Sequence, residues 1–193
     1  LNSRLIAWPL HLLNCCLVTD GGGALVLVSE ERAKDFPKPP VWVLGRGESV
    51  QHTNISQMWD YSEWTAAAKI TGPEAFRMAD MDHSAIDHLM LYDAFSHTPI
   101  YALEALGFVG AGEAGPWFAE MRGAPGGALP VNTNGGGLSY THTGMYGMFA
   151  IQEAVRQLRK EAVGRQVNDI ETSLVHAPGG WFSATSTLIL GNQ

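Results

Sequence analysis

Residues 132 to 147, NTNGGGLSYTHTGMYG, combine the side chains and the backbone that a catalytic site needs. His142 carries an imidazole, whose ordinary pKa lies near neutrality, so it exchanges protons readily. Tyr140 and Tyr146 lie on either side of it, and a phenol can move a proton or donate a hydrogen bond to a developing oxyanion. Three consecutive glycines precede these residues and allow a ligand to approach the backbone closely. The stretch therefore predicts a site in which His142, Tyr140 and Tyr146 are candidate catalytic residues.

Two further segments with reactive side chains stand at the ends of predicted strands. The first, YDAF, contains Tyr92, and the second, HAPGG, contains His176. Because ligands of α/β proteins bind where strand ends and loops converge, both segments are candidates for the same site. We expect Tyr92 to act in catalysis. The expected substrate-binding residues are Gly136, Gly137, His176, Gly179 and Gly180.

Each of these residues also has a structural interpretation. A buried tyrosine with a bonded hydroxyl is common in protein cores, so one of Tyr140 and Tyr146 is expected to serve packing. His176 is equally compatible with a capped strand end. Asp93, beside Tyr92, is compatible with a local turn in which its carboxylate accepts backbone N–H bonds.

Composition limits the class of protein. The chain has 193 residues, is 46% hydrophobic and 16% charged, and can therefore bury a core. Its net charge of -7 gives no electrostatic basis for binding nucleic acid, and no apolar run approaches the roughly 20 residues of a membrane span. The adjacent Cys15 and Cys16 indicate reduced thiols in a cytoplasmic protein, and no Cys, His and Asp cluster has metal-ligand spacing. The chain lacks a signal peptide and a start methionine, as though cut from something longer.

The pattern of elements predicts an α/β layered fold, in which buried strands alternate with helices. Helix 72–81 is expected to place Pro73 in its first turn. Residues 50–71 and 110–117 are expected to be loops, the former over a binding surface. We call residues 132–147 the glycine motif. The helix that follows it is expected to bury Met148, Ile151, Val155, Leu158 and Ala162. The predicted strands are residues 24–29, 41–49, 86–95, 170–177 and 184–191, and the predicted helices are 29–36, 72–81, 97–107 and 148–162.

Four ordered motifs resemble the C-terminal half of a thiolase, and are most similar to the sterol-carrier-protein-type thiolases and thiolase-like lipid-transfer proteins. They are LLNCCLVTDGGGALVLVSEERA, YDAF, NTNGGGLSYTHTG and HAPGG, and the resemblance runs from about residue 12 to the end. It implies a βαβαβαββ domain with a mixed sheet and helices on its faces, dimerisation, and acyl-CoA substrates. Residues 1–38 would then end a thiolase-like N-terminal domain, and residues 39–193 would form the C-terminal domain.

The departures from that family narrow the chemistry. The two positions where thiolases carry an acid/base cysteine hold Ala94 and Ala177, and alanine cannot move a proton. Cys15 and Cys16 match a structural strand of the family and are expected to be small buried hydrophobes. His142 matches a family histidine that activates the nucleophile or binds the thioester carbonyl, and Tyr92 replaces the Asn or His of the oxyanion region. A thiolase-like fold with tyrosines in place of cysteines resembles the side-chain aldolases of bacterial steroid degradation.

Three functions follow as hypotheses. The leading one is a non-classical thiolase-superfamily enzyme that makes or breaks a carbon–carbon bond, favouring retro-aldol cleavage of a β-hydroxyacyl-CoA. The second is a degradative thiolase, or acetyl-CoA acyltransferase, whose cysteine lies in a missing N-terminal half. The third is a non-catalytic acyl-CoA or lipid-binding or scaffold protein. The resemblance implies coenzyme A as part of the substrate, no tightly bound cofactor, a homodimer, and a small partner subunit with an OB-fold and a zinc ribbon that binds acyl-CoA.

Overall fold

The computed structural model describes residues 2–53, 65–180 and 182–193, and its centre is a mixed β-sheet. The four strands lie in the order β3-β6-β5-β4. β6 runs antiparallel to β3 and β5, whereas β4 is parallel to β5. The strands are β3 (Trp42–Val50), β4 (Leu89–Leu91), β5 (Thr172–Gly179) and β6 (Ala184–Gly191).

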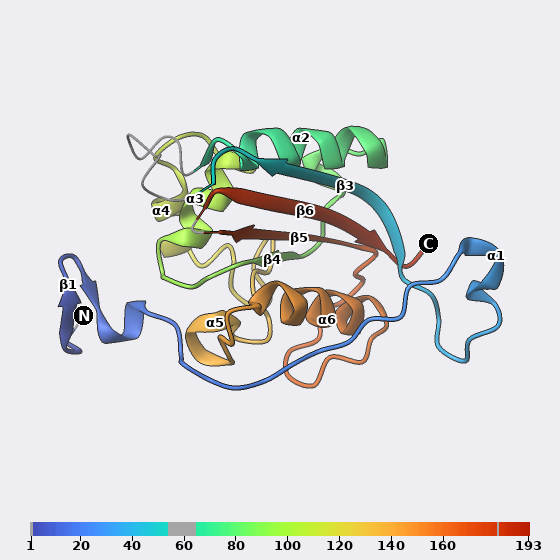
Figure 1. The fold of residues 1–193 in the computed structure, drawn as a ribbon, viewed down its shortest axis with the longest axis horizontal. Coiled ribbons are helices and arrows are strands. Elements are labelled where there is room, and N and C mark those ends of the chain that lie inside the picture. The colour runs from blue at the N-terminus through green and yellow to red at the C-terminus, as the bar shows by residue number, and fades with distance from the viewer. Residues whose placement is uncertain (1, 54–64, 181) are drawn as a thin grey trace.

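Helices cover both faces of this sheet. α2 (Ala68–Ala79) lies on one face and α6 (Tyr146–Leu158) on the other, as Figure 1 shows. α3 (Thr98–Ala105) and α4 (Ala114–Ala119) lie on the side of α2. The predicted α/β fold with a mixed sheet and helices on its faces is confirmed. Where the thiolase pattern has a further strand, Val131 forms an isolated parallel bridge with Leu89.

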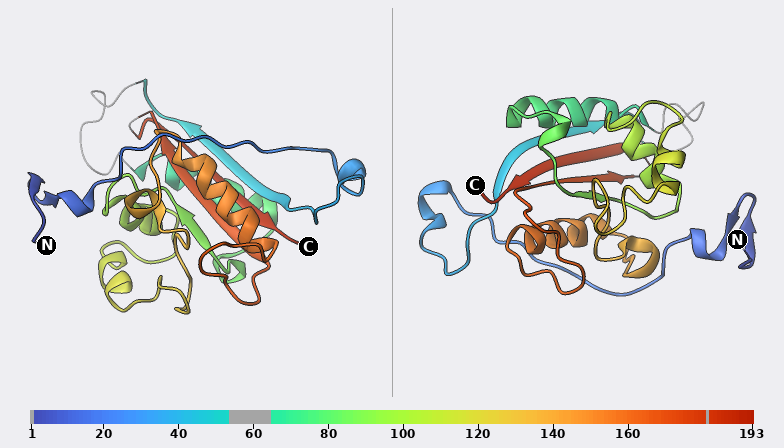
Figure 2. Two further views of the ribbon diagram at one scale, coloured as in Figure 1. Left: turned by 90° about the horizontal axis from the view of Figure 1, so that it is seen from below. Right: turned by 180° about the vertical axis from the view of Figure 1, so that it is seen from behind.

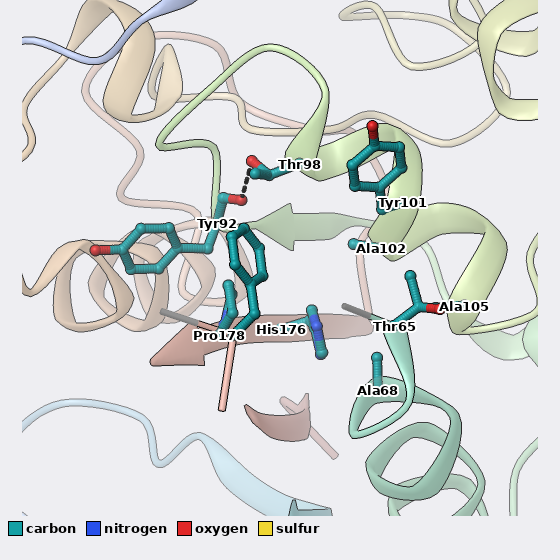
Figure 3. A pocket seen from close by; sticks show the side chains of 10 residues that line it. Thr65, Ala68, Tyr92, Thr98, Tyr101, Ala102, Ala105, His176 and Pro178 are labelled. Atoms are coloured by element: carbon teal, nitrogen blue, oxygen red, sulfur yellow. Dashed lines mark hydrogen bonds between the residues drawn. The ribbon is translucent and has the colours of Figure 1, made fainter. Parts of the chain in front are cut away.

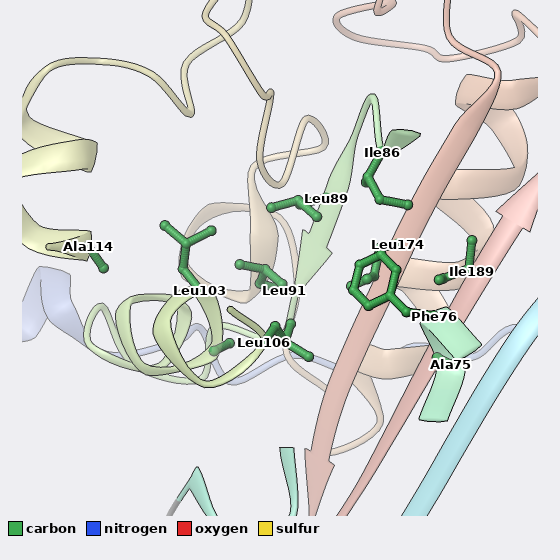
Figure 4. Packing of buried hydrophobic residues seen from close by; sticks show 11 residues of the cluster. Ala75, Phe76, Ile86, Leu89, Leu91, Leu103, Leu106, Ala114, Leu174 and Ile189 are labelled. Carbon is green, nitrogen blue, oxygen red and sulfur yellow. The ribbon is translucent and has the colours of Figure 1, made fainter. Parts of the chain in front are cut away.

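Two apolar clusters, one on each face, hold the layers together. Figure 4 shows the cluster between the sheet and the helices α2, α3 and α4, where Leu91, Leu103 and Leu174 are fully buried. The second cluster joins α6 to the opposite face of β4, β5 and β6 through Tyr146, Met90 and Val175. β5 is buried over its first five residues because it lies inside the sheet with a helix layer on each side.

Glycines in β3 allow α2 to pack directly on the sheet. A Cβ atom on Gly47 would overlap the carbonyl oxygen of Thr71, so no larger residue fits there. The hydroxyl of Thr71 in turn forms hydrogen bonds with the hydroxyls of Thr187 at 2.8 Å and Thr185 at 3.3 Å on β6. The close approach therefore lets a buried polar group of α2 find partners on the sheet.

The predicted buried face of the helix after the glycine motif was only partly correct, because Leu158 is buried while Ile151 and Val155 pack at the edge of the same cluster. α6 buries Tyr146, Phe149, Ala150, Glu153, Ala154, Gln157 and Leu158, whereas Met148, Ile151 and Val155 are only partly buried and Ala162 lies beyond the helix. The apolar spacing misleads because two polar side chains of α6 are buried. Glu153 Oε1 accepts hydrogen bonds from Thr133 Oγ1 at 2.6 Å and from Gln157 Nε2 at 2.8 Å.

The N-terminal region lies outside the layers. It comprises β1 (Leu5–Ala7), β2 (Leu10–His11), the 3-10 helix η1 (Leu12–Asn14) and α1 (Glu30–Ala33). Between η1 and α1 the chain runs extended along α6 (Figures 1 and 2). The predicted strand at 24–29 was wrong, because this segment pairs with no strand among the described residues and exposes Val26 and Leu27 by 80% and 82%.

Other element boundaries also differ from prediction. α2 begins four residues before Gly72, so Pro73 lies inside the helix rather than in its first turn, and its missing N–H leaves one helical bond unmade. The segment predicted to be a loop at 110–117 contains the start of α4, because Trp117 and Phe118 pack on the core beside α3. The strand predicted at 86–95 is confined to β4.

The strands at 41–49, 170–177 and 184–191 and the helix ending at Gly107 agree with prediction to within about two residues. α1 also forms where a short helix was expected, although it covers only Glu30–Ala33. Half of the predicted binding loop at 50–71, including Trp59, Tyr61 and Trp64, lies outside the described residues, and the loop prediction was wrong from Ala68 onward, where α2 begins. In the part of the chain that the structure describes, no helix has both the length and the apolar character needed to cross a membrane.

Candidate active site

The carboxyl end of β4 leads directly into the first loop of the site. The backbone N–H of Tyr92 donates to the carbonyl of His176 at 3.0 Å, which continues the pairing of β4 with β5. The Tyr92 carbonyl accepts from the Thr98 hydroxyl at 2.9 Å, a bond drawn in Figure 3. These two bonds fix the backbone of Tyr92 between the sheet and the start of α3.

The glycine motif folds against this first loop. Gly135, with φ of 96°, precedes the single-turn helix α5 (Gly136–Ser139). The buried carboxylate of Asp93 accepts hydrogen bonds from the N–H groups of Gly137 at 2.6 Å and Leu138 at 3.3 Å. Gly136 and Gly137, predicted to bind substrate, are thus brought against a carboxylate of the protein itself.

Asn132 and Asn134, which come just before the glycines, hold this part of the chain in place with their side chains. The side-chain amide of Asn132 forms two bonds with Leu91, donating to its carbonyl and accepting from its N–H, each at 2.8 Å. Asn134 Oδ1 accepts from the N–H of Gly136 at 2.9 Å and from the Tyr146 hydroxyl at 3.0 Å. The motif is therefore tied both to β4 and to the first turn of α6.

His142 follows α5 and faces Tyr92. The ring centroids of Tyr92 and His142 lie 5.5 Å apart at an interplanar angle of 85°. The backbone N–H of His142 donates to the Thr19 hydroxyl at 3.1 Å, which holds this residue to the N-terminal segment. Its Nε2 is buried and has no hydrogen-bond partner among the described residues. An unsatisfied buried nitrogen is costly in a folded protein, so one that persists in a candidate site calls for an explanation, and a bond to a ligand is one.

Tyr146 lies beside the same pair but is inaccessible. Its side chain is fully buried, and its ring meets that of Tyr92 edge to face with centroids 5.4 Å apart. Burial raises the pKa of Tyr146, so the phenol stays protonated and donates a hydrogen bond to Asn134 Oδ1. In this arrangement Tyr146 supports Tyr92 and the glycine motif.

We expect Tyr146→Phe to destabilise the folded chain by about 1 kcal/mol, because one buried hydrogen bond is lost while Asn134 keeps its bond from Gly136. Denaturant unfolding of the two proteins measures the difference. Tyr140→Phe is the matched control, since the Tyr140 side chain is 46% exposed, and it should change stability by less than about 0.5 kcal/mol. Equal effects of the two substitutions would contradict this account of Tyr146.

The ring of Tyr140 contacts a different residue from those of the other three candidate catalytic residues. Its ring packs edge to face on Phe149 of α6, with centroids 6.1 Å apart. The structure therefore brings Tyr92, His142 and Tyr146 into one aromatic cluster, whereas Tyr140 is at the surface beside it.

The HAPGG segment begins inside β5, where it contributes His176 to the site. His176 is 3% exposed, and its Nδ1 is hydrogen-bonded to the Thr187 hydroxyl at 2.9 Å. Burial lowers the pKa of His176 to about 4, so its ring is neutral at physiological pH. Gly179 and Gly180 are exposed at the turn between β5 and β6, where Gly180 has φ of 55°. Their described contacts are those of a hairpin turn.

A shallow pocket separates His176 from α2 and α3. It encloses about 320 Å³, part of which is open solvent, and Figure 3 shows Tyr92 and His176 at its wall with small residues of both helices. Its lining residues are Thr65, Ala68, Tyr92, Thr98, Tyr101, Ala102, Ala105, His176, Pro178 and Phe182. Because the 320 Å³ includes open solvent, the enclosed space is much smaller than the roughly 300–1,000 Å³ of an ordinary ligand pocket.

Backbone hydrogen bonds place Cys15 and Cys16 beside the loop that contains Tyr92. Cys15 forms an isolated antiparallel bridge with Phe95, and the N–H of Cys16 donates to the carbonyl of Ala94 at 2.9 Å. Both are free thiols and partly buried, and burial raises the pKa of Cys16, which keeps it protonated. The side chains of Ala94 and Ala177, the positions compared above with thiolase cysteines, cannot move a proton.

Polar residues that sequence reasoning missed hold the site in place. Asp93 was interpreted as a residue of a local turn, yet its hydrogen bonds reach α5, 44 and 45 residues away. Thr19 and Asn134 gave no signal of their own, because a single threonine or asparagine in a loop has many uses. Among the described residues, no group of three or more His, Cys, Asp or Glu side chains is arranged to hold a metal ion.

Comparison with known proteins identifies related chains. A family model described as thiolase C-terminal domain-like matches residues 47–192. The chain is 40% identical over 193 residues to a steroid side-chain-cleaving aldolase of Thermomonospora curvata, covering 98% of this chain and 48% of that protein. It is 37% identical over 193 residues to the 17-hydroxy-3-oxo-4-pregnene-20-carboxyl-CoA lyase of Mycobacterium tuberculosis, covering 98% of this chain and 49% of the lyase.

Solved structures agree with these relatives. The structure of an Ltp2-ChsH2(DUF35) aldolase superposes with a TM-score of 0.86 at 38% identity, covering 98% of this chain and 49% of that one. A thiolase-like protein of Mycobacterium smegmatis, with a TM-score of 0.55 at 19% identity over 79% of this chain and 29% of its own, supports the fold alone. The chain thus spans about half the length of the curated relatives named above.

Proposed function

Because the chain belongs to the thiolase C-terminal domain-like family, we propose that it forms part of an enzyme that cleaves a β-hydroxyacyl-CoA by a retro-aldol reaction. One observation carries the proposal. Tyr92 and His142 face each other, and His142 presents a buried Nε2 with no partner among the described residues, while Ala94 and Ala177 remove the sulfur chemistry of a thiolase. Relatives named as an aldolase and as a carboxyl-CoA lyase support the same reaction class.

In the proposed reaction His142 acts as the base and Tyr92 stabilises the enolate. His142 Nε2 accepts the proton of the substrate's β-hydroxyl group, and the electrons of that O–H bond form a new carbonyl. The bond between the α and β carbons breaks, and its electron pair becomes the enolate of the thioester. The enolate carbon then takes up a proton, which gives a shortened acyl-CoA and an aldehyde or ketone.

Tyr92 is suited to stabilise the enolate. Burial raises the pKa of Tyr92, although a backbone hydrogen bond at Tyr146 partly offsets this effect. The phenol therefore stays protonated and can donate a hydrogen bond to the developing oxyanion. Tyr146, buried behind Tyr92, fixes its ring without contacting the substrate.

The remaining parts of the assembly are also proposals. The exposed apolar segment at 24–29 is consistent with residues 1–38 ending an N-terminal thiolase-like domain and residues 39–193 forming the C-terminal domain. We assign the enzyme to the cytoplasm, as a homodimer that uses coenzyme A only as part of its substrate. The aldolase that resembles this chain was solved as an Ltp2-ChsH2(DUF35) assembly, which supports a small acyl-CoA-binding partner subunit here.

The test uses the full-length enzyme with its partner subunit and a β-hydroxyacyl-CoA substrate. We expect an aldehyde or ketone to form together with a shortened acyl-CoA. His142→Ala should lower kcat by about 100-fold to 10,000-fold, as expected for loss of a general base, and Tyr92→Phe by about 100-fold, as expected for loss of an oxyanion donor. His83→Ala is the matched control, because His83 bonds to the carbonyl of Leu106 near the opposite end of β4 and should leave kcat unchanged.

The products of this assay distinguish an aldolase from a degradative thiolase and from a non-catalytic carrier. Thiolysis of a 3-ketoacyl-CoA without cleavage of the β-hydroxyacyl-CoA would overturn the aldolase proposal in favour of a degradative thiolase. Tight binding of acyl-CoA without turnover of either compound would instead indicate a non-catalytic carrier. Turnover that is unaffected by both His142→Ala and Tyr92→Phe would remove these residues from the mechanism.

A further inference from the structure

Asp93 links the two loops that carry Tyr92 and His142. It follows Tyr92 directly in the chain, and its carboxylate receives the N–H groups of Gly137 and Leu138 in the glycine motif. Gly137 also borders His142, since a Cβ atom on this glycine would lie 3.3 Å from the His142 ring carbon Cδ2. One short series of contacts therefore runs from Tyr92 through Asp93 and Gly137 to His142.

The carboxylate is held mainly by backbone N–H groups, with a side-chain hydrogen bond from Asn132. Asp93 is 3% exposed, and within the described ranges no Lys or Arg forms an ion pair with it. Burying a charge without a counter-ion is costly, so the sequence retains an expensive group where an amide or hydroxyl would bury more readily. Burial raises the pKa of Asp93 to about 6, although hydrogen bonds from backbone N–H groups and from Asn132 oppose this rise. The carboxylate of Asp93 is therefore expected to have a role beyond filling space.

The space around the carboxylate is also shaped for it. A Cβ atom on Gly136 would overlap Asp93 Oδ2 and would lie 2.6 Å from its Cγ. Gly136 has φ of 66°, a conformation that glycine adopts without strain. Both loops are thus fitted to one carboxylate, and their relative position depends on it.

We propose that Asp93 is a positioning residue for the proposed reaction: its carboxylate holds the Gly137–Leu138 backbone against the Tyr92 loop and so sets the spacing between His142 Nε2 and the Tyr92 phenol. Asp93 acts through these two side chains and does not contact the substrate. The inference rests on the proposed function for its catalytic consequence, but its geometric consequence can be measured without turnover.

Asp87, which lies at the other end of β4, provides a control. It lies just before β4, whereas Asp93 lies just after it. Asp87 Oδ2 also accepts two backbone N–H groups, from Glu171 at 2.9 Å and from Thr172 at 3.0 Å. Asp87 is only partly buried and also accepts from the Thr172 hydroxyl at 3.2 Å, but both carboxylates bind two backbone N–H groups, and Asp93 is the one that adjoins the candidate catalytic residues.

The experiment compares Asp93→Asn with Asp87→Asn in the full-length enzyme with its partner. Asparagine keeps the size of aspartate but turns an NH₂ group toward one of the two backbone donors, so one hydrogen bond becomes a repulsive contact. We expect Asp93→Asn to lower kcat by about 100-fold with little change in KM, because misplacement of reacting groups by about 1 Å costs that much. Asp87→Asn should leave kcat unchanged, whatever its effect on thermal stability.

Hydrogen exchange and crystal structures of both variants supply a readout independent of turnover. We expect faster exchange of the Gly137 and Leu138 amides and a changed Tyr92–His142 ring separation in Asp93→Asn, and neither change in Asp87→Asn. Unchanged kcat in Asp93→Asn overturns the proposal, and so does an equal loss of kcat in both variants, which would indicate general destabilisation. If the unsubstituted enzyme does not cleave the substrate, the proposed function fails. An unchanged ring separation in Asp93→Asn then overturns the positioning role, and a changed one supports it.

Discussion

Replacement of Gly136 by alanine is expected to destabilise the folded chain by roughly 3–5 kcal/mol, the sum of left-handed backbone strain and of displaced hydrogen bonds to a buried charge. Gly136 has φ of 66°, where a Cβ atom meets the backbone unfavourably. The same atom would overlap the Asp93 carboxylate, which must move away from the N–H groups of Gly137 and Leu138. Chemical denaturation of the variant measures the effect.

Gly144→Ala separates these two contributions. Gly144 also has a left-handed backbone, with φ of 80°, but no atom lies within 4 Å of the position that its Cβ would take. This control should cost only the backbone strain, about 1–2 kcal/mol. The excess cost at Gly136 then reports the displacement of Asp93. If the two variants were equally stable, the tight fit between the glycine motif and Asp93 would be refuted.

Acidification is expected to produce the second large effect, through two buried histidines. Burial lowers the pKa of His88 and of His176 to about 4, from an ordinary value of 6.5. Between these values the unfolded chain binds more protons than the folded chain, so stability falls as the pH falls from 6.5 to 4. Each histidine should remove about 3 kcal/mol over this window.

Asp93 opposes this trend. Its pKa is raised by burial from 3.8 to about 6, so its ionisation costs stability above pH 6 and that cost is recovered as the pH falls toward 3.8. The recovery is about 3 kcal/mol, which leaves a net loss of about 3 kcal/mol from the three groups together. Their effect is large beside the 5–15 kcal/mol that stabilises a typical domain.

Unfolding free energies measured in denaturant between pH 7 and pH 4 test this balance. His88→Gln should make the dependence on pH shallower, because one titrating group is removed. Asp93→Asn should make it steeper, because the opposing group is lost. A pH dependence that is identical in the two variants would show that these groups do not control acid stability.

The sequence was most informative where the local pattern and the tertiary environment agree. The strand β3, which contains Gly45 and Gly47, the hairpin of β5 and β6, and the helix that stops before Gly107 were predicted from apolar runs and glycines. In β5, β6 and α3 the neighbouring layer buries most residues that the pattern marks as apolar, so the local preference and the packing coincide. The order of these elements was sufficient to predict the α/β fold class.

Prediction failed where a distant contact decides the local state. Residues 24–29 have the composition of a buried strand, but a strand requires a partner for its backbone groups, and none of the described residues pairs with them. α6 buries Glu153 and Gln157 because Thr133, 24 residues before Gln157, shares hydrogen bonds with both. No periodicity of apolar residues can reveal a buried face that contains polar groups satisfied in this way.

The candidate site shows the same division. By itself, the sequence determined which side chains were available for chemistry: a histidine and tyrosines near a glycine run, with alanines in place of the family's cysteines. Tertiary structure alone decided that Tyr92, His142 and Tyr146 form one cluster, that Tyr140 stays at its edge, and that Gly136 and Gly137 face Asp93. The physical reason is that side-chain chemistry is a property of each residue, whereas the burial and hydrogen bonding that govern its use come from residues more than 40 positions away in the chain.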